Sequence, residues 1–367
     1  MTAHDRELDI LNAIEDAKRS RRSFLGGAAA AAAGVVVLGE TVAHAATDPA
    51  AAGPNLAASP PPGFSPFAAP GRIVKVKKAG SLQKNKIYPV PDDAKAMLTR
   101  CLTELTGEPD LVKAVSRFVH KDDKVCVKVN GIALRNHSTN LELVIPFIEA
   151  MIASGVPAEH ITVLEQYGSF LAGTRINQQN VPAGVKVTVH QNSDATMPER
   201  MIPGTGVRTK FVRALTESTA AINFSLIKDH SICGYTGCLK NMTHGCQIYP
   251  HYYHTHHASP QIALLYAQDI VKTRVRLNIT DAFQVMYHGG PLDKQPQCRV
   301  PYESVFATTD PVAMDTIGTE IVEQFRAENG LKSLAAEGRP PAYIKAAGDL
   351  GLGIADRSKI QVKEVVI

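Results

Sequence analysis

The chain has 367 residues, of which 44% are hydrophobic and 20% are charged, and its formal net charge is +4. This composition is typical of a globular protein and excludes an intrinsically disordered or fibrous chain. So small a net charge, without a run of Lys or Arg, predicts no nucleic-acid partner, and six cysteines are too few for a disulfide scaffold.

The first 45 residues have the pattern of a twin-arginine export signal. Arg21 and Arg22 are paired, a Gly/Ala/Val/Leu run covers residues 26–38, and residues 43–45 read Ala-His-Ala. The run is shorter than the roughly 20 residues that span a bilayer, which favours a cleaved signal over a membrane anchor. We therefore expect cleavage after Ala45, the twin-arginine translocase as a partner during export, and a periplasmic or otherwise exported protein that is not integral to the membrane.

Beyond the signal, residues 46–72 are rich in Ala and Pro and predict a flexible linker. From Ile73 onward, strand patterns cover residues 124–130, 161–164, 185–190, 221–226, 275–279, 305–308 and 360–366. Helical patterns cover residues 141–154, 211–217, 262–273, 311–326 and 342–347. This alternation predicts an α/β fold with a mainly parallel sheet, helices on both faces and two lobes, with a sub-boundary near residue 270.

Polar clusters follow three of the predicted strands, at residues 130–140, 165–175 and 228–257. In parallel sheets, ligands bind beyond the carboxyl ends of the strands. The sequence therefore predicts that these clusters contribute to one site. Two aspartates further along the chain have positions that suggest structural roles. Asp310 precedes Pro311 as a helix N-cap, and Asp281 ends a strand near the site.

The third cluster contains a lysine framed by glycines. Gly234, Gly237 and Gly245 allow the backbone to approach a ligand closely, and Lys240 lies between them with no carboxylate in the adjacent sequence. Such a lysine either binds an anion or, when removed from water, acts as a nucleophile. The alternative is a solvated lysine on a surface loop.

The same stretch is rich in side chains that bind metals. Three cysteines occur with the spacing C-x4-C-x7-C, and five histidines lie between residues 244 and 257. The cysteine spacing matches neither a zinc ribbon nor a common ferredoxin, so small buried thiols are the alternative. The density of histidines favours at least one ligand to a metal of unknown identity. The candidate ligands are His244, His254, His256, Cys238 and Cys246.

Several motifs in order resemble the DUF362 family over roughly residues 73–367. They are Lys228-Asp229-His230, Gly234-x-Thr236, Leu239-Lys240-Asn241, residues 278–282 before Gly289-Gly290-Pro291, and residues 309–315. The family carries no established reaction. The resemblance implies an exported protein, because many members are exported.

A more distant similarity links residues 230–245 to the nickel-pincer lactate racemases. The shared pattern is His230-x3-Gly234-x-Thr236-Gly237-x2-Lys240-x4-Gly245. The resemblance implies that Lys240 is covalently attached to a pyridinium nucleotide that holds nickel, that His230 is a catalytic acid/base and that His256 binds the metal. It also implies cofactor-binding roles for a wider set, namely Gly234, Thr236, Gly237, Asn130 and Arg135. Asn241, which belongs to the DUF362 pattern rather than the racemase one, is a further candidate for cofactor binding.

One part of the racemase pattern differs. After the strand at residues 161–164, the racemases have a second catalytic histidine, whereas this chain has Glu165 and Tyr167. Tyr167 or Glu165 would have to take that role, because racemisation needs proton-transfer groups on both faces of a carbon, or a hydride-transfer partner.

Three hypotheses follow. The first is an exported enzyme with a metal or metal-organic cofactor, racemase- or epimerase-like or redox, that acts on a small hydroxy acid or carboxylate held by Arg135 or Arg175. The second is an iron–sulfur or metal-binding redox protein that uses Cys233, Cys238 and Cys246. The third is a non-catalytic periplasmic protein in which Lys240 and the glycines bind an anion.

Overall fold

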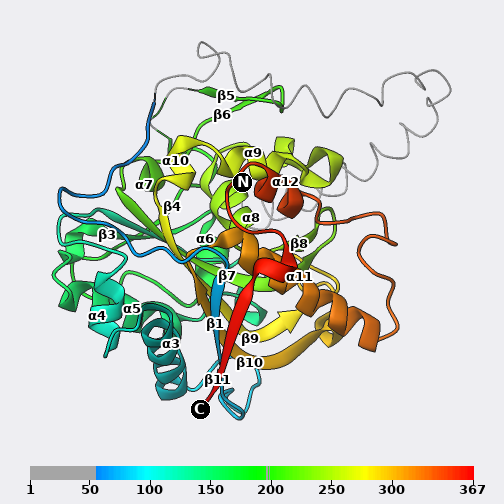
Figure 1. The fold of residues 1–367 in the computed structure, drawn as a ribbon, viewed down its shortest axis with the longest axis horizontal. Coiled ribbons are helices and arrows are strands. Elements are labelled where there is room, and N and C mark those ends of the chain that lie inside the picture. Colours follow the sequence, from blue (N-terminus) through cyan, green and yellow to red (C-terminus); the bar gives the residue numbers. More distant parts are fainter. Residues whose placement is uncertain (1–54, 196, 198) are drawn as a thin grey trace. The chain divides into compact units, whose positions relative to one another are not determined.

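A nine-stranded sheet runs through the part of the chain that the computed structural model describes, which is residues 55–195, 197 and 199–367 (Figure 1). The predicted export signal lies outside these residues. The strands of the sheet are β1 (Arg72–Lys77), β2 (Val125–Lys128), β3 (Ile161–Glu165), β4 (Lys186–Val189), β7 (Ala220–His230), β8 (Gly234–Thr236), β9 (Val275–Met286), β10 (Arg299–Thr308) and β11 (Gln361–Val366). Two further strands, β5 (Arg200–Ile202) and β6 (Val207–Thr209), pair only with each other within the described residues.

The sheet is mainly parallel, as the sequence predicts. Its order is β11-β1-β10-β9-β7-β2-β3-β4, and β8 pairs with β7 as a hairpin. Only β10 and β8 run against the other strands in this described sheet. From β2 the chain moves outward to β3 and β4 and then returns to the other side of β2 with β7. The strand order therefore reverses between β2 and β7, which is where open α/β sheets bind ligands.

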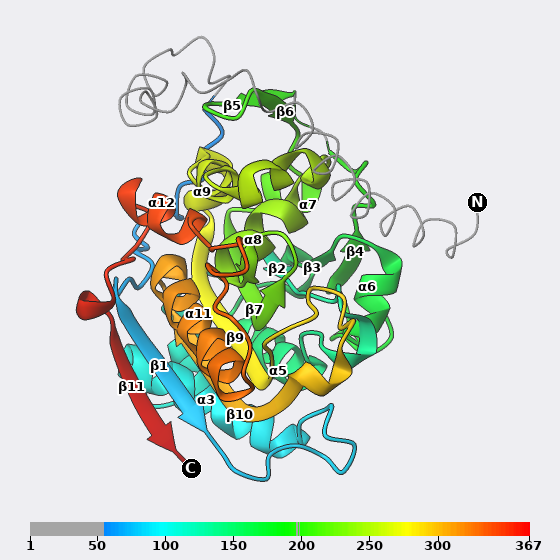
Figure 2. The same cartoon turned by 90° about the vertical axis from the view of Figure 1, so that its right-hand side faces the viewer.

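Helices cover both faces of the sheet, which confirms that expectation (Figure 2). The helices are α3 (Pro91–Thr106), α4 (Leu111–Ser116), α5 (Leu141–Ala153), α6 (Gly168–Gly173), α7 (Arg213–Thr216), α8 (Cys238–Thr243), α9 (Gln261–Tyr266), α10 (Asp269–Lys272), α11 (Pro311–Glu328) and α12 (Tyr343–Asp349). Side chains on one face, such as Val74 and Phe224, pack with α3, α4 and α5, whereas Ile73 and Ile227 on the other face pack with α8, α9, α11 and α12. This alternation follows from the two-residue period of a strand.

Local signals explain where two of the helices begin and end. α11 begins as predicted, because the Asp310 carboxylate accepts a hydrogen bond from the Ala313 amide at 2.9 Å and Pro311 occupies the first turn. The single helix predicted over residues 262–273 is divided into α9 and α10. The backbone of Gln268 is extended there, and the carboxylate of Asp269 binds the Leu56 amide at 2.6 Å and the Arg200 guanidinium.

Residues 55–72, for which a flexible linker is predicted, contact the rest of the described chain. Leu56 hydrogen-bonds to Asp269 and accepts a bond from Arg274 Nη1 at 2.9 Å, and the ring of Phe67 packs edge-on against Phe118. A few apolar residues within this Ala/Pro-rich stretch hold it against the domain, and β1 already begins at Arg72. The sub-boundary expected near residue 270 falls between β7 and β9, which pair directly, so the sheet continues where we expected a second lobe to begin.

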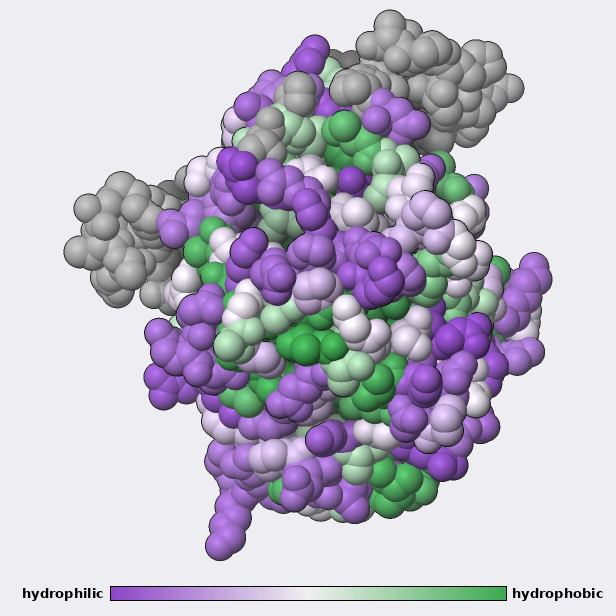
Figure 3. Space-filling model, turned by 90° about the vertical axis from the view of Figure 1, so that its left-hand side faces the viewer, coloured by the Kyte–Doolittle hydropathy of each residue, from purple (hydrophilic) through white to green (hydrophobic). Residues whose placement is uncertain are grey.

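The surface mixes polar and apolar groups. On the face shown in Figure 3, hydrophobic areas are small and lie among hydrophilic residues. The large exposed apolar residues of the described chain come from separate parts of the sequence: Leu134, Tyr252, Leu350, Val366 and Ile367. Within residues 55–367, apart from 196 and 198, no helix is both long enough and apolar enough to cross a bilayer.

Candidate functional site

Polar side chains from the ends of β2, β3 and β7 meet beside the point where the strand order reverses. Lys228 Nζ donates to Asn130 Oδ1 at 2.6 Å, and Asn130 Nδ2 donates to Asn241 Oδ1 at 3.1 Å. Lys128 Nζ lies 3.0 Å from Glu165 Oε2. Lys128 Nζ also donates to Asn241 Oδ1 at 3.4 Å, so these contacts join all three polar clusters predicted to follow strands.

The turn after β7 brings α8 back over the sheet. Gly234 has φ +74°, and a side chain there would collide with the carbonyl oxygen of Arg339. α8 then begins after Gly237, and its first amides, those of Cys238 and Leu239, donate to the Asp315 carboxylate at 2.6 and 3.0 Å. Asp315 is fully buried, and burial raises the pKa of its carboxyl group to about 7. The glycines and Asp315 thus fix the start of the helix that carries Lys240.

Lys240 contacts His230. Lys240 Nζ lies 3.0 Å from His230 Nε2, and the two residues are 7% and 4% exposed. The other ring nitrogen, His230 Nδ1, faces the amides of Ile232 and Cys233 at 3.1 and 3.4 Å. Because both amides donate, Nδ1 carries no proton, and a neutral imidazole must then be protonated at Nε2. This N–H donates to Lys240, whose amine must therefore be neutral.

The electrostatics of the pair agree with that assignment. Burial lowers the pKa of the Lys240 amine, and burial together with the nearby Lys240 lowers the pKa of His230 well below its usual value. A neutral amine is a nucleophile, and a neutral imidazole N–H polarises a carbonyl oxygen by hydrogen bonding. The arrangement is therefore suited to reaction with a carbonyl group.

Two further histidines pack beside His230. The ring of His254 stacks on that of His230 with centroids 5.6 Å apart and meets His244 edge-on at 4.7 Å. His254 Nδ1 lies 2.9 Å from the Pro250 carbonyl oxygen, and burial lowers the pKa of His254 to about 3. His256, the metal ligand that the racemase resemblance implies, is exposed. In this loop it is His254, rather than His256, that lies against His230.

The described residues do not assemble the predicted metal-ligand set, because no group of three or more His, Cys, Asp or Glu residues is arranged around a common centre. Each cysteine of the stretch has its own partner. Cys238 Sγ lies 3.1 Å from Ser225 Oγ, and Cys233 Sγ lies 3.2 Å from the Tyr235 carbonyl oxygen. Cys246 Sγ lies 4.0 Å from the Asn241 carbonyl oxygen. Burial raises the pKa of Cys233 and Cys246 to about 12, so without a bound metal both thiols hold their protons.

Three other predicted residues lie apart from the Lys240–His230 pair or are already engaged. The hydroxyl of Tyr167 accepts a hydrogen bond from Asn192 Nδ2 at 2.6 Å. Arg175 forms two bonds with the Glu142 carboxylate, at 2.8 and 2.6 Å. The substrate-binding role considered for Arg175 is not supported, because this carboxylate neutralises its charge. Arg135 is exposed in the turn after β2.

Several predicted cofactor-binding residues form contacts that support the architecture of the site. Thr236 pairs with Lys228 across the β7–β8 hairpin, and Gly237 lies against Asp315 and Tyr235 without room for a side chain. Asn241 Nδ2 donates to Asn223 Oδ1 at 2.7 Å, which connects α8 to the middle of β7.

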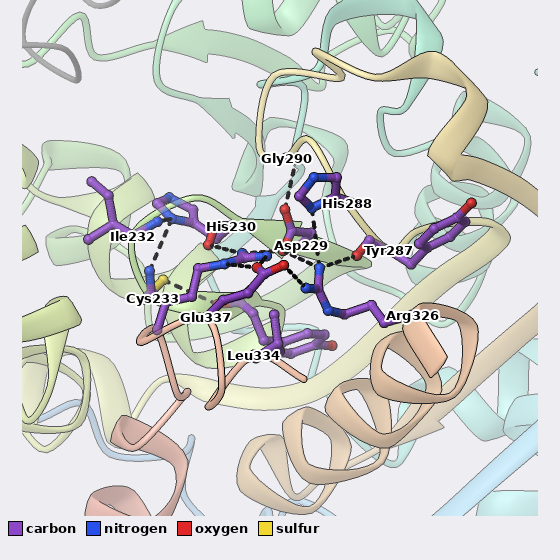
Figure 4. A network of polar contacts seen from close by, with 12 residues as sticks. Asp229, His230, Ile232, Cys233, Tyr287, His288, Gly290, Arg326, Leu334 and Glu337 are labelled. Carbon is purple, nitrogen blue, oxygen red and sulfur yellow. Dashed lines mark hydrogen bonds and ion pairs between the residues drawn. The ribbon is translucent and has the colours of Figure 1, made fainter. Parts of the chain in front are cut away.

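A network of buried charges lies behind His230 and was not predicted (Figure 4). The Asp229 carboxylate binds the Arg339 guanidinium and accepts a bond from the Gly290 amide at 3.1 Å. Arg339 also donates to the His230 carbonyl oxygen at 2.9 Å, and Glu337 bridges Arg339 to the fully buried Arg326 of α11. The network therefore fixes the backbone at His230. Asp229 and His230 lie about 110 residues from Arg339 in the chain, so sequence spacing did not indicate these contacts.

Two buried lysines were also missed. Lys128 and Lys228 are each 1% exposed, and both occupy fully buried strands. A lysine within a strand of otherwise apolar or neutral residues was the available signal, since lysine is rarely buried without a specific partner.

The family model described as "Domain of unknown function (DUF362)" matches residues 125–320, which extend from β2 into α11 and include the whole Lys240–His230 site. Among solved structures, the lactate racemase apoprotein from Thermoanaerobacterium thermosaccharolyticum is similar with a TM-score of 0.33 and 12% sequence identity. The match covers 71% of this chain and 60% of that chain, so the chain spans less than two thirds of the racemase. No curated protein matches.

Proposed function

The chain belongs to the DUF362 family, and we propose that it is an enzyme whose reactive centre is the Lys240–His230 pair. The observation that carries the proposal is the 3.0 Å contact between Lys240 Nζ and His230 Nε2, in a setting where His230 Nδ1 is occupied by two amide donors. This arrangement keeps the amine of Lys240 unprotonated without a neighbouring base. An unprotonated lysine amine is the form that reacts with carbonyl compounds.

In this proposal, a carbonyl group that enters the site replaces Lys240 as the hydrogen-bond acceptor of the His230 Nε2–H. The bond polarises the carbonyl, and Lys240 Nζ forms a C–N bond with its carbon. The two amine protons pass to the carbonyl oxygen, which leaves as water, and an imine remains. His230 keeps its Nε2 proton throughout as a hydrogen-bond donor, so the ring never has to become an anion.

The resemblance to the nickel-pincer lactate racemases supports a finer proposal, in which Lys240 carries a metal-organic cofactor and the substrate is a small hydroxy acid or carboxylate. Lys240 fits as the attachment point, because its amine is neutral and buried. When bound, such a cofactor supplies an electron-accepting centre next to the substrate carbon. A cofactor that brings metal donors of its own needs few from the protein. Of the two candidate histidine ligands in this loop, His254 lies against His230, whereas His256 is exposed.

Mass spectrometry of protein from its native host tests the proposal. We expect Lys240 either to carry a covalent group on isolation or to be labelled by pyruvate with borohydride, and Lys240→Arg to show neither. Lys345, which is 79% exposed, provides the matched control as Lys345→Arg. Lys240 that is unmodified and labels no faster than Lys345 overturns the proposal.

We also propose that the protein is exported by the twin-arginine pathway, with the translocase as a transient partner. The paired Arg21 and Arg22, the apolar run at residues 26–38 and the Ala-His-Ala site support it. Replacing both arginines with lysine should leave uncleaved protein in the cytoplasm when cells are fractionated. Equal export of the double variant would count against the pathway.

A further inference from the structure

Lys228 is a buried lysine that few protein groups satisfy. It is 1% exposed at the end of β7, beside the reversal of strand order. Within the described residues, the hydrogen bond recorded for its Nζ goes to Asn130 Oδ1 at 2.6 Å. An ammonium group has three N–H donors, so this neutral amide leaves most of the hydrogen-bonding capacity of Lys228 unused.

The carboxylates that face Lys228 are already paired with other cations. Glu165 on β3 binds Lys128 at 3.0 Å, and Asp293 after β9 lies 3.3 Å from Arg299 Nε. The charged and titratable groups that act on Lys228 are Glu165, Lys240, Lys128, Asp293, His137 and His230. With Lys240 neutral, the cations Lys128, Lys228 and Arg299 still outnumber the carboxylates Glu165 and Asp293, which favours an additional negative group.

A second buried polar atom close by lacks a partner. His137 is 3% exposed, and its buried Nε2 has no hydrogen-bond partner within 3.5 Å among the described residues, although the Ile227 backbone and the Gln284 side chain lie near its ring. His137 lies near enough to Lys228 for the charge of the lysine to contribute to its lowered pKa. Buried polar atoms are nearly always paired, so an unpaired ring nitrogen beside an under-satisfied lysine indicates a missing polar ligand.

We propose that Lys228 binds the carboxylate or phosphate of a ligand where β2 and β7 meet, with His137 contacting a neighbouring oxygen. This proposal deepens the proposed function by naming the residue that holds the anionic end of the substrate or cofactor, and it rests on that function only for what happens at Lys240. Lys228 takes the substrate-binding role that we considered for Arg175, because Glu142 neutralises the charge of Arg175.

Binding of the anion should be accompanied by uptake of a proton at Lys228. Burial lowers the pKa of Lys228 to about 7, so the free protein holds a mixture of amine and ammonium at neutral pH. A bound anion stabilises the ammonium and raises the pKa of Lys228. Binding above pH 7 therefore takes up a proton, and the affinity falls as the pH rises.

Calorimetric titration of the full mature chain with inorganic phosphate, and separately with L-lactate, tests this inference. We expect at least one anion to bind the wild type roughly tenfold or more tightly at pH 6.5 than at pH 8.5, with proton uptake seen as a dependence of the heat on the buffer. Binding of phosphate alone identifies a phosphate site, and binding of lactate identifies a carboxylate site.

The variants separate this inference from the proposed function. Lys228→Met should weaken binding at least tenfold, Lys228→Arg should restore part of it, and Lys345→Met should bind like the wild type. Proton uptake by the wild type tests the site even where Lys228→Met fails to fold. Failure of both anions to bind, or equal binding by a folded Lys228→Met protein, overturns the inference. Lys240→Arg should still bind the anion. The anion site can therefore be confirmed even if the proposed reaction at Lys240 is disproved.

Discussion

The tautomer of His230 connects the backbone of one turn to the reactivity of Lys240. The Ile232 and Cys233 amides occupy Nδ1, which leaves the proton on Nε2 and makes Lys240 an acceptor. Gly234 makes this turn possible, because its φ of +74° and its contact with Arg339 leave no room for a side chain. The chemistry of the site thus depends on one glycine that touches neither reactive group.

Gly234→Ala should destabilise the protein more than Gly338→Ala does. Both glycines have positive φ, at +74° and +72°, so the conformational strain of an alanine is similar. An added Cβ meets the Arg339 carbonyl at Gly234, whereas nothing lies within 4 Å at Gly338. We expect a difference of roughly 2 kcal/mol or more in the free energy of unfolding, measured in urea. Equal losses of unfolding free energy in the two variants would show that a Cβ at position 234 does not collide with the Arg339 carbonyl.

The sequence identified Lys240 and His230 but not how Arg175 is used. Lys240 and His230 lie ten residues apart around a glycine-rich turn, so local spacing was informative. The partner of Arg175, Glu142, is 33 residues away on α5, and no local pattern reports that pairing. Lys128 was missed because its strand reads as an alternating run, in which a lysine does not reveal the direction of its side chain. Lys228 was placed in the polar cluster after the strand predicted at residues 221–226, whereas β7 extends to His230 and buries it.

At the scale of elements, α8 depends on a carboxylate from another helix. Asp315 of α11 accepts two hydrogen bonds from the first amides of α8, in place of an N-cap side chain. The interaction links the position of Lys240 to the packing of α11 against the sheet.

Asp315→Asn should change how stability depends on pH. Burial raises the pKa of Asp315 from 3.8 to about 7, so the native state holds a proton that the unfolded chain releases between those values. The wild type should therefore lose stability relative to Asp315→Asn as the pH rises from about 4 to about 7, by up to roughly 4 kcal/mol, and change little above that range. Urea unfolding at several pH values measures the difference. A constant difference would mean that Asp315 titrates normally.

Several elements could be predicted, because their hydrophobic periodicity reflects which face is buried, but β7, β9 and β10 extend well beyond the ranges predicted for them. α5, α11, β2 and β3 match the expected ranges closely. α3 was not predicted, and β8 is too short to have a period of its own. The break between α9 and α10 depends on Leu56 and Arg200, which are distant in sequence and bind Asp269.

At the scale of the whole molecule, buried charges join α11, the end of β9 and the segment after α11 to the back of the site. Arg326 is fully buried, with Glu337 at 2.5 Å and Asp229 at 3.9 Å. Two guanidinium groups, those of Arg326 and Arg339, pair with three carboxylates, those of Asp229, Glu323 and Glu337. Asp229 is the most deeply buried of the three carboxylates, so its removal leaves the least compensated charge inside the protein.

Asp229→Asn should cost about 3–5 kcal/mol of unfolding free energy, because Asp229 is buried between the two arginines. Glu337→Gln serves as the matched control. The side chain of Glu337 is 25% exposed, and its loss should cost about 1 kcal/mol. Chemical denaturation of both variants provides the comparison, and equal costs would contradict the assignment of Asp229 as the centre of the network.

The segment before β1 should also contribute to stability. A chain that begins at residue 72 lacks the contacts of Leu56 with Asp269 and Arg274 and the packing of Phe67 on Phe118. We expect its free energy of unfolding to be about 2 kcal/mol lower than that of the chain that begins at residue 46. Equal stability of the two chains in urea would restore the linker interpretation.

Nitrogen NMR of the mature chain, labelled with ¹⁵N at histidine rings and lysine Nζ, tests the central claim most directly. His230→Gln and Lys240→Arg assign the two signals. Between pH 6 and 9, His230 should be protonated at Nε2 and bare at Nδ1, and Lys240 should give the signal of a neutral amine at pH values where exposed lysines such as Lys345 are still charged. A proton on Nδ1 of His230, together with a Lys240 signal that titrates with the exposed lysines, would contradict the account.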